Sequence, residues 1–478
     1  MSGQITVEWA NLDRMFAAMQ QIDTQSTEIT TYVNDHMCSN AGFDYPACVL
    51  RPIGDQLGTV GGWFADARDF FGEKWLGVMQ TVEASARLID QQDNQVDVDF
   101  GRYMGEMGPY VPQDFPPLTV EVALFDLQDL ALDEPERPED GQLNHNEQWE
   151  SLSGGYDSLR DTINTGIDRI NSLGVVSIDR LPETSLDEFV VYPLSGDYLA
   201  IGGNANACNQ VQTDMSTWGM NFTLVSGEVT LALQGQVEAS LIAHINAYNA
   251  VMQAIGLVVG AGSEVFDSIA LVSERIAVQV ENALVTMLRI LGRVSAKIAT
   301  RVLGWFGWAM LAKDIIERGA EAITDIVDDV RTCIEIIQAC FDLKDAIEAW
   351  AEEQAQRLET FQEIQDLMET LPVTVQGGNL DDLPTVDLPA LEQRLNEMGI
   401  DISFGDNEGE GQDALDDELN DLDENYGPDS ETGQDAAESD GGESDSDDSS
   451  YEPDDDEMLM APGPLGPDGG SSSTGPVV

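Results

Sequence analysis

The sequence predicts an all-α protein, and two features support this fold class. The stretch from Leu231 to Trp350 contains no proline, and its apolar residues recur at steps of three and four, which is the period of a buried helical stripe. Similar stripes run between residues 12 and 89 and between residues 198 and 225. A helix with so much apolar surface is not stable alone in water, so we expect these segments to pack together as a bundle.

The first unit, residues 1–107, is predicted to be an N-terminal helical hairpin. Its first arm has an apolar stripe from Leu12 to Val33, and its second arm, which Pro52 can open, continues from Ile53 to Ile89. Stripes with steps of three and four on both arms favour antiparallel packing of one arm against the other.

Five cysteines are too few for a disulfide framework. Cys38 and Cys48 bracket the loop between the two arms of this hairpin, and a disulfide between them would staple the helix ends in an oxidising compartment. The sequence favours neither this disulfide nor two free thiols. We expect Cys208, Cys333 and Cys340 to be small apolar residues of the core.

Residues 108–145 are predicted to be a linker rich in proline and acidic residues, with a short apolar segment at 118–132 that can dock on the bundle. Residues 146–376 follow as the main helical region. It begins with a helical segment that is interrupted at residues 153–155, followed by a β-rich piece at residues 189–192 and by Asp197 as the N-cap of a long helix.

Residues 377–478 are predicted to be a disordered acidic tail, apart from a short helical segment near residues 388–398. From Asp381 onward the chain has 31 acidic residues and one basic residue, Arg394. Such a segment cannot bury enough apolar surface to offset the entropy of ordering its chain.

Charge limits the classes of partner, because the formal net charge of the chain is -68. A field of this sign repels nucleic acid phosphates and anionic lipid. We therefore expect no nucleic acid partner, and we interpret the charge first as a means of solubility and second as an acidic recognition surface. The first residues have no basic cluster followed by an apolar segment, and the purest apolar run, Val302–Ala312, is too short to span a bilayer. We expect a soluble chain without a cleaved signal peptide.

Residues for chemistry are sparse. His36, His145 and His244 lie far apart in the sequence and match no metal-binding or nucleophile pattern, and no glycine-rich phosphate loop is present. We therefore predict no catalytic, cofactor-binding or metal site, and we do not expect an enzyme.

One group of basic residues, Arg289, Arg293, Lys297 and Arg301, is spaced by four along the apolar stretch. We call this group the basic ridge, because steps of four keep the side chains near one face of a helix. The ridge can pair with acidic residues of neighbouring helices such as Asp325, Asp328 and Asp329, and this is the interpretation that we favour. It can also dock the acidic tail or contact an anionic membrane surface.

A family resemblance enters at residues 192–266. Residues 193–198 (Pro-Leu-Ser-Gly-Asp-Tyr) lead into one long amphipathic helix, and the triplet Leu233-Gln234-Gly235 then forms a tight turn that opens a second helix. This arrangement resembles the WxG-type helical hairpins, which are substrates and effector carriers of the type VII (ESX) secretion systems of actinobacteria and their relatives. In that family the turn carries Trp-x-Gly; here the glycine is kept and leucine replaces tryptophan.

The N-terminal hairpin resembles the same architecture, although its literal match, Trp75-Leu76-Gly77, falls in the middle of a predicted helix. Family members usually carry a Tyr-x-x-x-Asp/Glu export signal after the hairpin. Tyr110 and Asp114 have this spacing, with Pro112 between them.

The resemblance implies a non-enzymatic secreted substrate or structural component of a type VII-like route. Such a protein would be cytoplasmic before export and would act by helix–helix association with the secretion machinery, a helical partner or a second copy. Two alternatives remain open. The first is a membrane-perturbing protein whose helices between Gly256 and Trp308 enter lipid, and the second is a structural protein of a halophile or its virus, which the acidity suggests.

Overall fold

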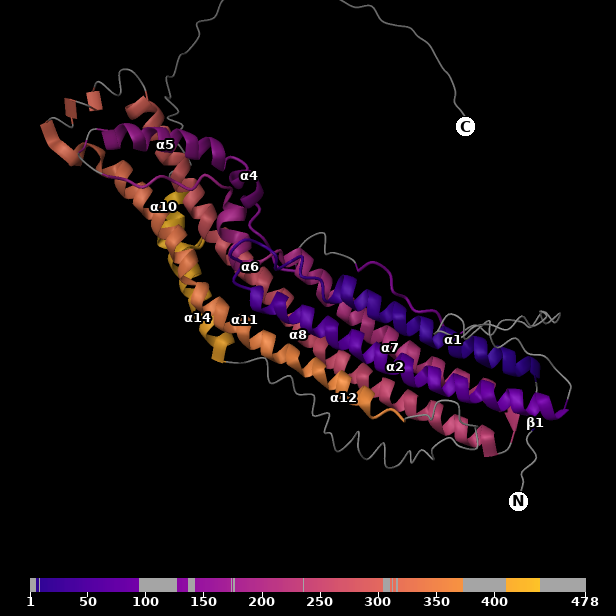
Figure 1. The fold of residues 1–478 in the computed structure, drawn as a ribbon. Coiled ribbons are helices and arrows are strands. Elements are labelled where there is room, and N and C mark those ends of the chain that lie inside the picture. The colour runs from indigo at the N-terminus through magenta and orange to yellow at the C-terminus, as the bar shows by residue number, and fades with distance from the viewer. Residues whose placement is uncertain are drawn as a thin grey trace, which may run out of the picture. The chain divides into compact units, whose positions relative to one another are not determined.

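The computed structural model is all-α, as predicted, with one short β-ladder (Figure 1). It describes residues 6–7, 9–93, 127–135, 142–172, 174, 177–234, 236–303, 310–311, 313–314, 317–372 and 410–438. All of these belong to one compact unit, Met1–Asp440. The expected boundaries at residues 107, 145 and 376 therefore do not separate independent units. Helices from the segments 1–107, 146–376 and 377–478 share one core.

The described elements, in chain order, are β1 (Thr6–Val7), α1 (Trp9–Tyr32), η1 (Val33–Met37), α2 (Arg51–Asp93), α4 (Trp149–Ser153), α5 (Tyr156–Ser172), η2 (Asp187–Val191), α6 (Tyr192–Ser195), α7 (Tyr198–Ala232), β2 (Leu233–Gln234), α8 (Gln236–Ile298), η3 (Ala299–Leu303), η4 (Gly319–Ile323), α10 (Thr324–Asp342), α11 (Lys344–Leu358), η5 (Glu359–Gln362), α12 (Glu363–Glu369), α14 (Glu410–Tyr426) and α15 (Glu431–Glu438).

Helix α8 is the axis of the unit, and α7 packs against it as the other arm of a hairpin (Figure 1). The Asp197 carboxylate accepts a hydrogen bond from the Ala200 N–H over 3.1 Å and caps α7, as predicted. At the two ends of α8, Glu238 lies in the first turn and Lys297 in the last, where each charge is favoured by the helix dipole.

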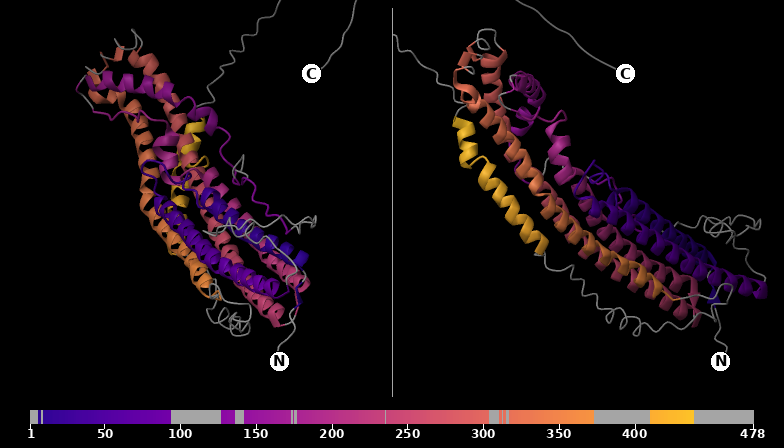
Figure 2. Two further views of the ribbon diagram at one scale, coloured as in Figure 1. Left: turned by 45° about the vertical axis from the view of Figure 1, so that its right-hand side comes forward. Right: turned by 60° about the vertical axis from the view of Figure 1, so that its left-hand side comes forward.

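The N-terminal arms α1 and α2 lie beside this hairpin (Figures 1 and 2). Helix α1 packs closely against α7 as well as against α2, while α2 also contacts α11 and α12. The two arms therefore bury their apolar stripes mainly in the shared bundle, and not only against each other as the sequence predicted.

An aromatic cluster fills the space between the two hairpins. It consists of Phe71 and Trp75 from α2, Trp218 and Phe222 from α7, and Tyr248 from α8, each at most 3 % exposed. Ring centroids within this cluster are between 5.1 and 6.4 Å apart, mostly in edge-to-face arrangements. Side chains of this size dominate the energetics of a core, so the cluster joins three helices into one unit.

The C-terminal half of α8 carries a second group of helices, namely α4, α5, α10 and the turn η3 (Figure 1). The segment between α5 and α7 forms η2 and α6, so the strand expected at residues 189–192 is wrong. Its buried residues Leu186, Val190 and Leu194 recur every four positions, which is a helical period and not the alternation of a strand.

Two helices, α14 and α15, lie within the predicted tail, and there the expectation of disorder is wrong. Leu415, Leu419 and Leu422 are buried at helical spacing, and α14 packs against α8 and α11 (Figure 2). The three leucines give this acidic helix an apolar face that the overall composition concealed. The helical segment expected near residues 388–398 lies outside the described residues.

Two glycines of α8 differ in the space around them, so substitution by alanine should have opposite effects on stability. A methyl group at Gly262 would overlap the buried ring of Phe361, whereas one at Gly292 would meet no atom within 4 Å. We expect Gly262→Ala to lower the free energy of unfolding by about 1–3 kcal/mol through overpacking. Gly292→Ala should raise it by about 0.5–1 kcal/mol, because alanine is the better helix former. Urea unfolding followed by circular dichroism measures both values, and equal effects would contradict this packing.

Candidate functional site

The turn between α7 and α8 contains the predicted triplet Leu233-Gln234-Gly235. Leu233 and Gln234 form β2, which pairs antiparallel with β1 so that Leu233 is opposite Val7 and Gln234 is opposite Thr6. Leu233 is 2 % exposed, Gln234 is exposed, and Gly235 lies outside the described residues. The N-terminal strand therefore closes the turn and helps to bury Leu233.

Polar contacts from α1 support this closed turn. The Asn11 amide donates a hydrogen bond to the Leu231 carbonyl over 3.0 Å. One turn further along α1, Arg14 Nη2 lies 3.1 Å from Glu228 Oε1, and the glutamate side chain is only 4 % exposed. Removing water from a carboxylate is costly unless it is paired, so this contact fixes the register of α1 on α7.

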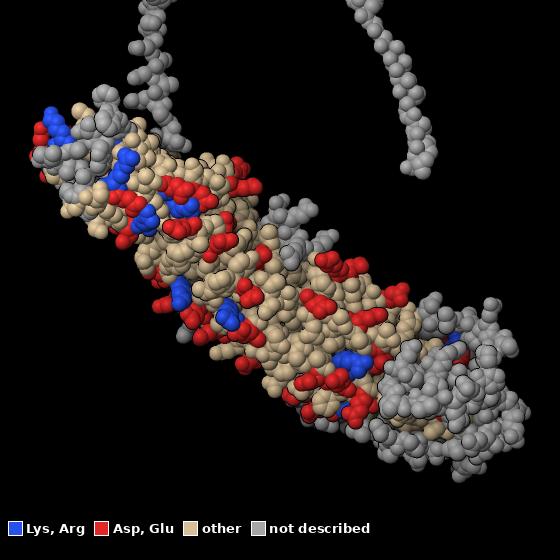
Figure 3. Space-filling view, turned by 45° about the horizontal axis from the view of Figure 1, so that its top comes forward, with Lys and Arg blue, Asp and Glu red and all other residues tan. Residues whose placement is uncertain are grey.

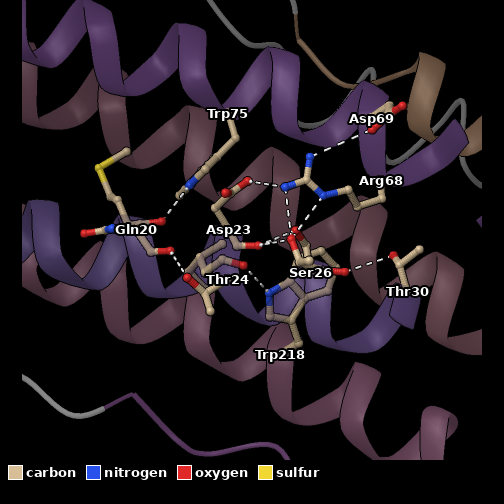
Figure 4. A network of polar contacts seen from close by, with 12 residues as sticks. Gln20, Asp23, Thr24, Ser26, Thr30, Arg68, Asp69, Trp75 and Trp218 are labelled. Carbon is tan, nitrogen blue, oxygen red and sulfur yellow. Dashed lines mark hydrogen bonds and ion pairs between the residues drawn. The ribbon is translucent and has the colours of Figure 1, made fainter. Parts of the chain in front are cut away.

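Two tryptophans, one from α2 and one from α7, donate hydrogen bonds to the main chain of α1 (Figure 4). Trp75 Nε1 of α2 donates to the Met19 carbonyl over 2.9 Å, and Trp218 Nε1 of α7 donates to the Ile22 carbonyl over 3.2 Å. Trp75-Leu76-Gly77 lies within α2, as predicted, so this literal match to Trp-x-Gly forms no turn. Trp75 is instead a core residue that joins α1 to α2.

The basic ridge is paired with residues of its own chain. Lys297 Nζ lies 2.5 Å from Asp329 Oδ2, and Arg301 Nη1 lies 2.8 Å from Asp325 Oδ2, as the favoured interpretation predicted. Asp328 differs from that prediction, because its ion pair is with Arg331 on the same helix.

The other two ridge residues reach different segments. Arg289 Nη2 donates to Gln148 Oε1 over 2.6 Å, and Arg293 Nη1 donates to the carbonyl of Asp435 in α15 over 2.9 Å. A further contact of this kind joins Arg275 to Asp416 of α14 at 2.5 Å. The ridge thus supports both the neighbouring helix α10 and the acidic C-terminal helices.

The Cys38 and Cys48 side chains are both buried free thiols, so the structure lacks the disulfide considered for them. Cys38 lies against α2 at Gly61, and burial raises its pKa to about 12. Cys48 belongs to a loop that docks elsewhere, with the Val49 N–H bonded to the Pro193 carbonyl over 2.8 Å. Tyr110 and Asp114, the expected export signal, lie outside the described residues.

His145 lies between two glutamates of α8 that sequence reasoning did not connect with it. Its Nδ1 is 2.8 Å from Glu281 Oε2, and its Nε2 is 3.4 Å from Glu274 Oε1. The Leu143 N–H donates to the same Glu274 oxygen over 2.6 Å. Both glutamates are nearly buried, with side chains 5 % exposed at Glu274 and 4 % at Glu281. These contacts anchor the end of the predicted linker to the middle of α8.

The surroundings of His145 decide what this anchor can do. Burial raises the pKa of Glu281, and the hydrogen bond and charge of His145 oppose that rise. The Tyr198 ring stacks on the imidazole with centroids 5.0 Å apart. Burial also raises the pKa of the Tyr198 hydroxyl. A general base needs a free nitrogen within reach of substrate. Nδ1 of His145 is bonded to Glu281, whereas Nε2 is buried 3.4 Å from Glu274 without a hydrogen bond among the described residues, so the arrangement suits an anchor of the linker end on α8.

A pocket of about 570 Å³ opens beside this anchor. Carboxylates of Glu147, Glu150 and Asp187 line it together with the rings of Trp149 and Tyr192. Such a lining disfavours anionic ligands such as phosphates. Within the described residues, no group of three or more His, Cys, Asp or Glu side chains could hold a metal ion.

Charge and hydropathy bear on the membrane alternative. Figure 3 shows acidic side chains spread over one face of the molecule, with few basic ones among them. In the described part of the chain, the helix Glu238–Leu303 is long and apolar enough, by length and composition, to cross a membrane, a span that the purest apolar run, Val302–Ala312, did not predict. In the bundle, 56 % of the most apolar 18-residue stretch of this helix is buried, so the same residues form the protein core.

No protein-family model, curated protein or solved structure matches the chain.

The buried Glu281 predicts a pH dependence. Its pKa is raised in the fold, so the folded state binds the carboxyl proton of Glu281 more tightly than the unfolded state does. The contribution of Glu281 to stability therefore falls as the pH rises from the pKa of the unfolded state to the pKa of the folded state. Glu281→Gln keeps a hydrogen-bond acceptor and removes the titration. The melting temperature of the variant minus that of the wild type should therefore increase between about pH 4.5 and neutral pH.

Thermal melts followed by circular dichroism at several pH values measure this difference. Glu147→Gln, at an exposed position of the same pocket, is the matched control for the loss of a carboxylate. A constant difference for Glu281→Gln would show that Glu281 does not sense pH in this way.

Proposed function

We propose that the protein is a non-enzymatic substrate or structural component of a type VII-like secretion route and acts by helix–helix association. The observation that carries this proposal is the α7–α8 hairpin, whose two long helices meet at the turn Leu233-Gln234-Gly235. Residues 193–198 precede it, and Asp197 caps its first helix, at the positions on which the resemblance to WxG-type hairpins depends.

The second hairpin supports the same proposal. Helices α1 and α2 flank α7 and α8, so the chain combines two helical hairpins in one bundle, joined by the aromatic cluster. Several large apolar side chains of the α7–α8 hairpin remain exposed in the described structure: Met220 at 49 %, Leu231 at 52 %, Leu257 at 63 % and Leu271 at 43 %. Exposed leucine and methionine side chains on helices are suited to contact with a helical protein partner.

The chemistry of the described residues also favours association over catalysis. The histidine that the fold gathers with carboxylates, His145, has both ring nitrogens directed at Glu274 and Glu281. The basic ridge, which could have contacted phosphates or anionic lipid, is occupied by intramolecular contacts. Within this proposal the protein is cytoplasmic before export.

Export in the producing organism tests the proposal. Inactivating the membrane ATPase of the type VII system should remove the protein from the culture medium and leave it inside the cells. Tyr110→Ala should have the same effect if Tyr110 and Asp114 form the export signal. Tyr451 and Asp455 have the same spacing within an acid-rich run, and Tyr451→Ala should leave export unchanged. Immunoblots of medium and cell fractions measure the result. Undiminished export without the ATPase would refute the proposal.

A further inference from the structure

An extended segment of the chain, Leu127–Pro135, lies on α1 and α7 and is held there by side-chain amides. We call it the strap. The Gln128 N–H donates to Asn221 Oδ1, and Asn221 Nδ2 donates to the Gln128 carbonyl, each over 2.9 Å. Gln25 Nε2 of α1 donates to the same carbonyl over 2.8 Å. Both backbone polar groups of Gln128 are thus bound by side chains from two helices.

A second anchor lies further along the strap. The Ala131 N–H donates to Asp214 Oδ1 over 2.8 Å. Residues 128 and 131 are three positions apart on an extended chain, which spans about 10 Å. Residues 214 and 221 are seven positions apart on α7, which is about 10.5 Å along a helix. The two spacings match, so Asp214 and Asn221 of α7 are as far apart as the two backbone N–H groups that they bind.

The strap is recognised by its main chain. Both anchors bind backbone groups, while the side chains contribute apolar contacts from the buried Leu127 and the partly buried Leu130 and Leu132. Asn221, Gln25 and Asp214 are 0 %, 3 % and 2 % exposed. Buried polar groups need hydrogen-bond partners, and the strap supplies them here. We call the surface between α1 and α7 on which the strap lies the groove. Any extended chain with suitably placed apolar side chains can therefore supply hydrogen-bond partners to the buried polar groups of the groove.

The strap leaves one polar group of the groove unused. Asp214 Oδ2 is buried and has no hydrogen-bond partner among the described residues. Burial raises the pKa of Asp214, and the charge of Asp133, two residues beyond Ala131 in the strap, raises it further, while the hydrogen bond from the Ala131 N–H opposes the rise. An occupant with a basic side chain at the position of Asp133 would supply the missing donor and reverse the repulsion.

We propose that the groove between α1 and α7 is a binding site for an extended, leucine-containing basic segment of a partner protein, and that the strap is its resident occupant. The net charge of -68 favours the approach of a basic partner. The strap is tethered to the groove, so it competes at an effective concentration of about millimolar order. It excludes weaker ligands and yields to a segment that pairs with Asp214.

Direct binding to the full chain tests this proposal. The variant Leu127→Ser/Leu132→Ser weakens the resident strap, and circular dichroism checks that it remains folded. The probes are two fluorescent peptides, one with the sequence of residues 127–135 and one that carries Lys in place of Asp133. By fluorescence anisotropy, the Lys peptide should bind the strap variant at least about tenfold more tightly than the unchanged peptide. It should bind the wild-type chain more weakly than the strap variant.

Three further variants in the same background identify the site. Asn221→Ala should weaken binding of both peptides by about tenfold or more, because the two hydrogen bonds to the backbone N–H and C=O at the position of Gln128 are lost. Asp214→Asn keeps an acceptor for the amide and should abolish the preference for the Lys peptide. Thr213→Ala, at an exposed neighbouring position, should change neither. Absence of binding to the folded strap variant, or a Lys preference that survives Asp214→Asn, would overturn the assignment. The assay uses purified protein, so its outcome is independent of export.

Discussion

Burial of the aromatic cluster is the interaction on which the arrangement of the two hairpins depends. Phe71, Trp75, Trp218, Phe222 and Tyr248 come from three helices and are almost completely removed from water. Trp75 and Trp218 also donate hydrogen bonds to carbonyls of α1, so the fourth helix is tied to the same cluster. Separating the hairpins would expose these rings to water and would break the hydrogen bond from Trp218 of α7 to Ile22 of α1, and both changes are costly. The chain therefore satisfies its own helical faces before it meets any partner.

The acidity of the chain explains how it uses its few basic residues. Arg293 and Arg275 contact the acidic helices α15 and α14, and Lys297 pairs with Asp329 of α10. In a molecule with this surplus of carboxylates, a cation placed on α8 determines which acidic segment can lie beside it. The same logic applies at His145, which lets two buried glutamates remain within an apolar helix. Helix α8 is thus the core of the bundle and also the element that selects its acidic neighbours.

The apolar period was enough to predict the long helices, and the side chain of Asp197 was enough to predict the N-cap of α7, because both features are local. The pairing of His145 with Glu274 and Glu281 joins residues more than a hundred positions apart, and no local pattern encodes such a pairing. A signal was nevertheless present, since two glutamates seven residues apart interrupt the apolar stripe of α8 on one face. Asn221 in α7 gave a similar signal for the strap. Helix α14 was missed because composition outweighed the helical spacing of Leu415, Leu419 and Leu422.

Native-state hydrogen exchange on the wild-type chain and on Trp75→Ala tests most directly whether the two hairpins form one cooperative unit. If they do, the most protected amides of α1, α2, α7 and α8 open together, and Trp75→Ala lowers their opening free energy in all four helices by a similar amount, about 3–5 kcal/mol. Loss of protection in α1 and α2 alone, with α7 and α8 unchanged, would show that the hairpins are independent and would contradict this account.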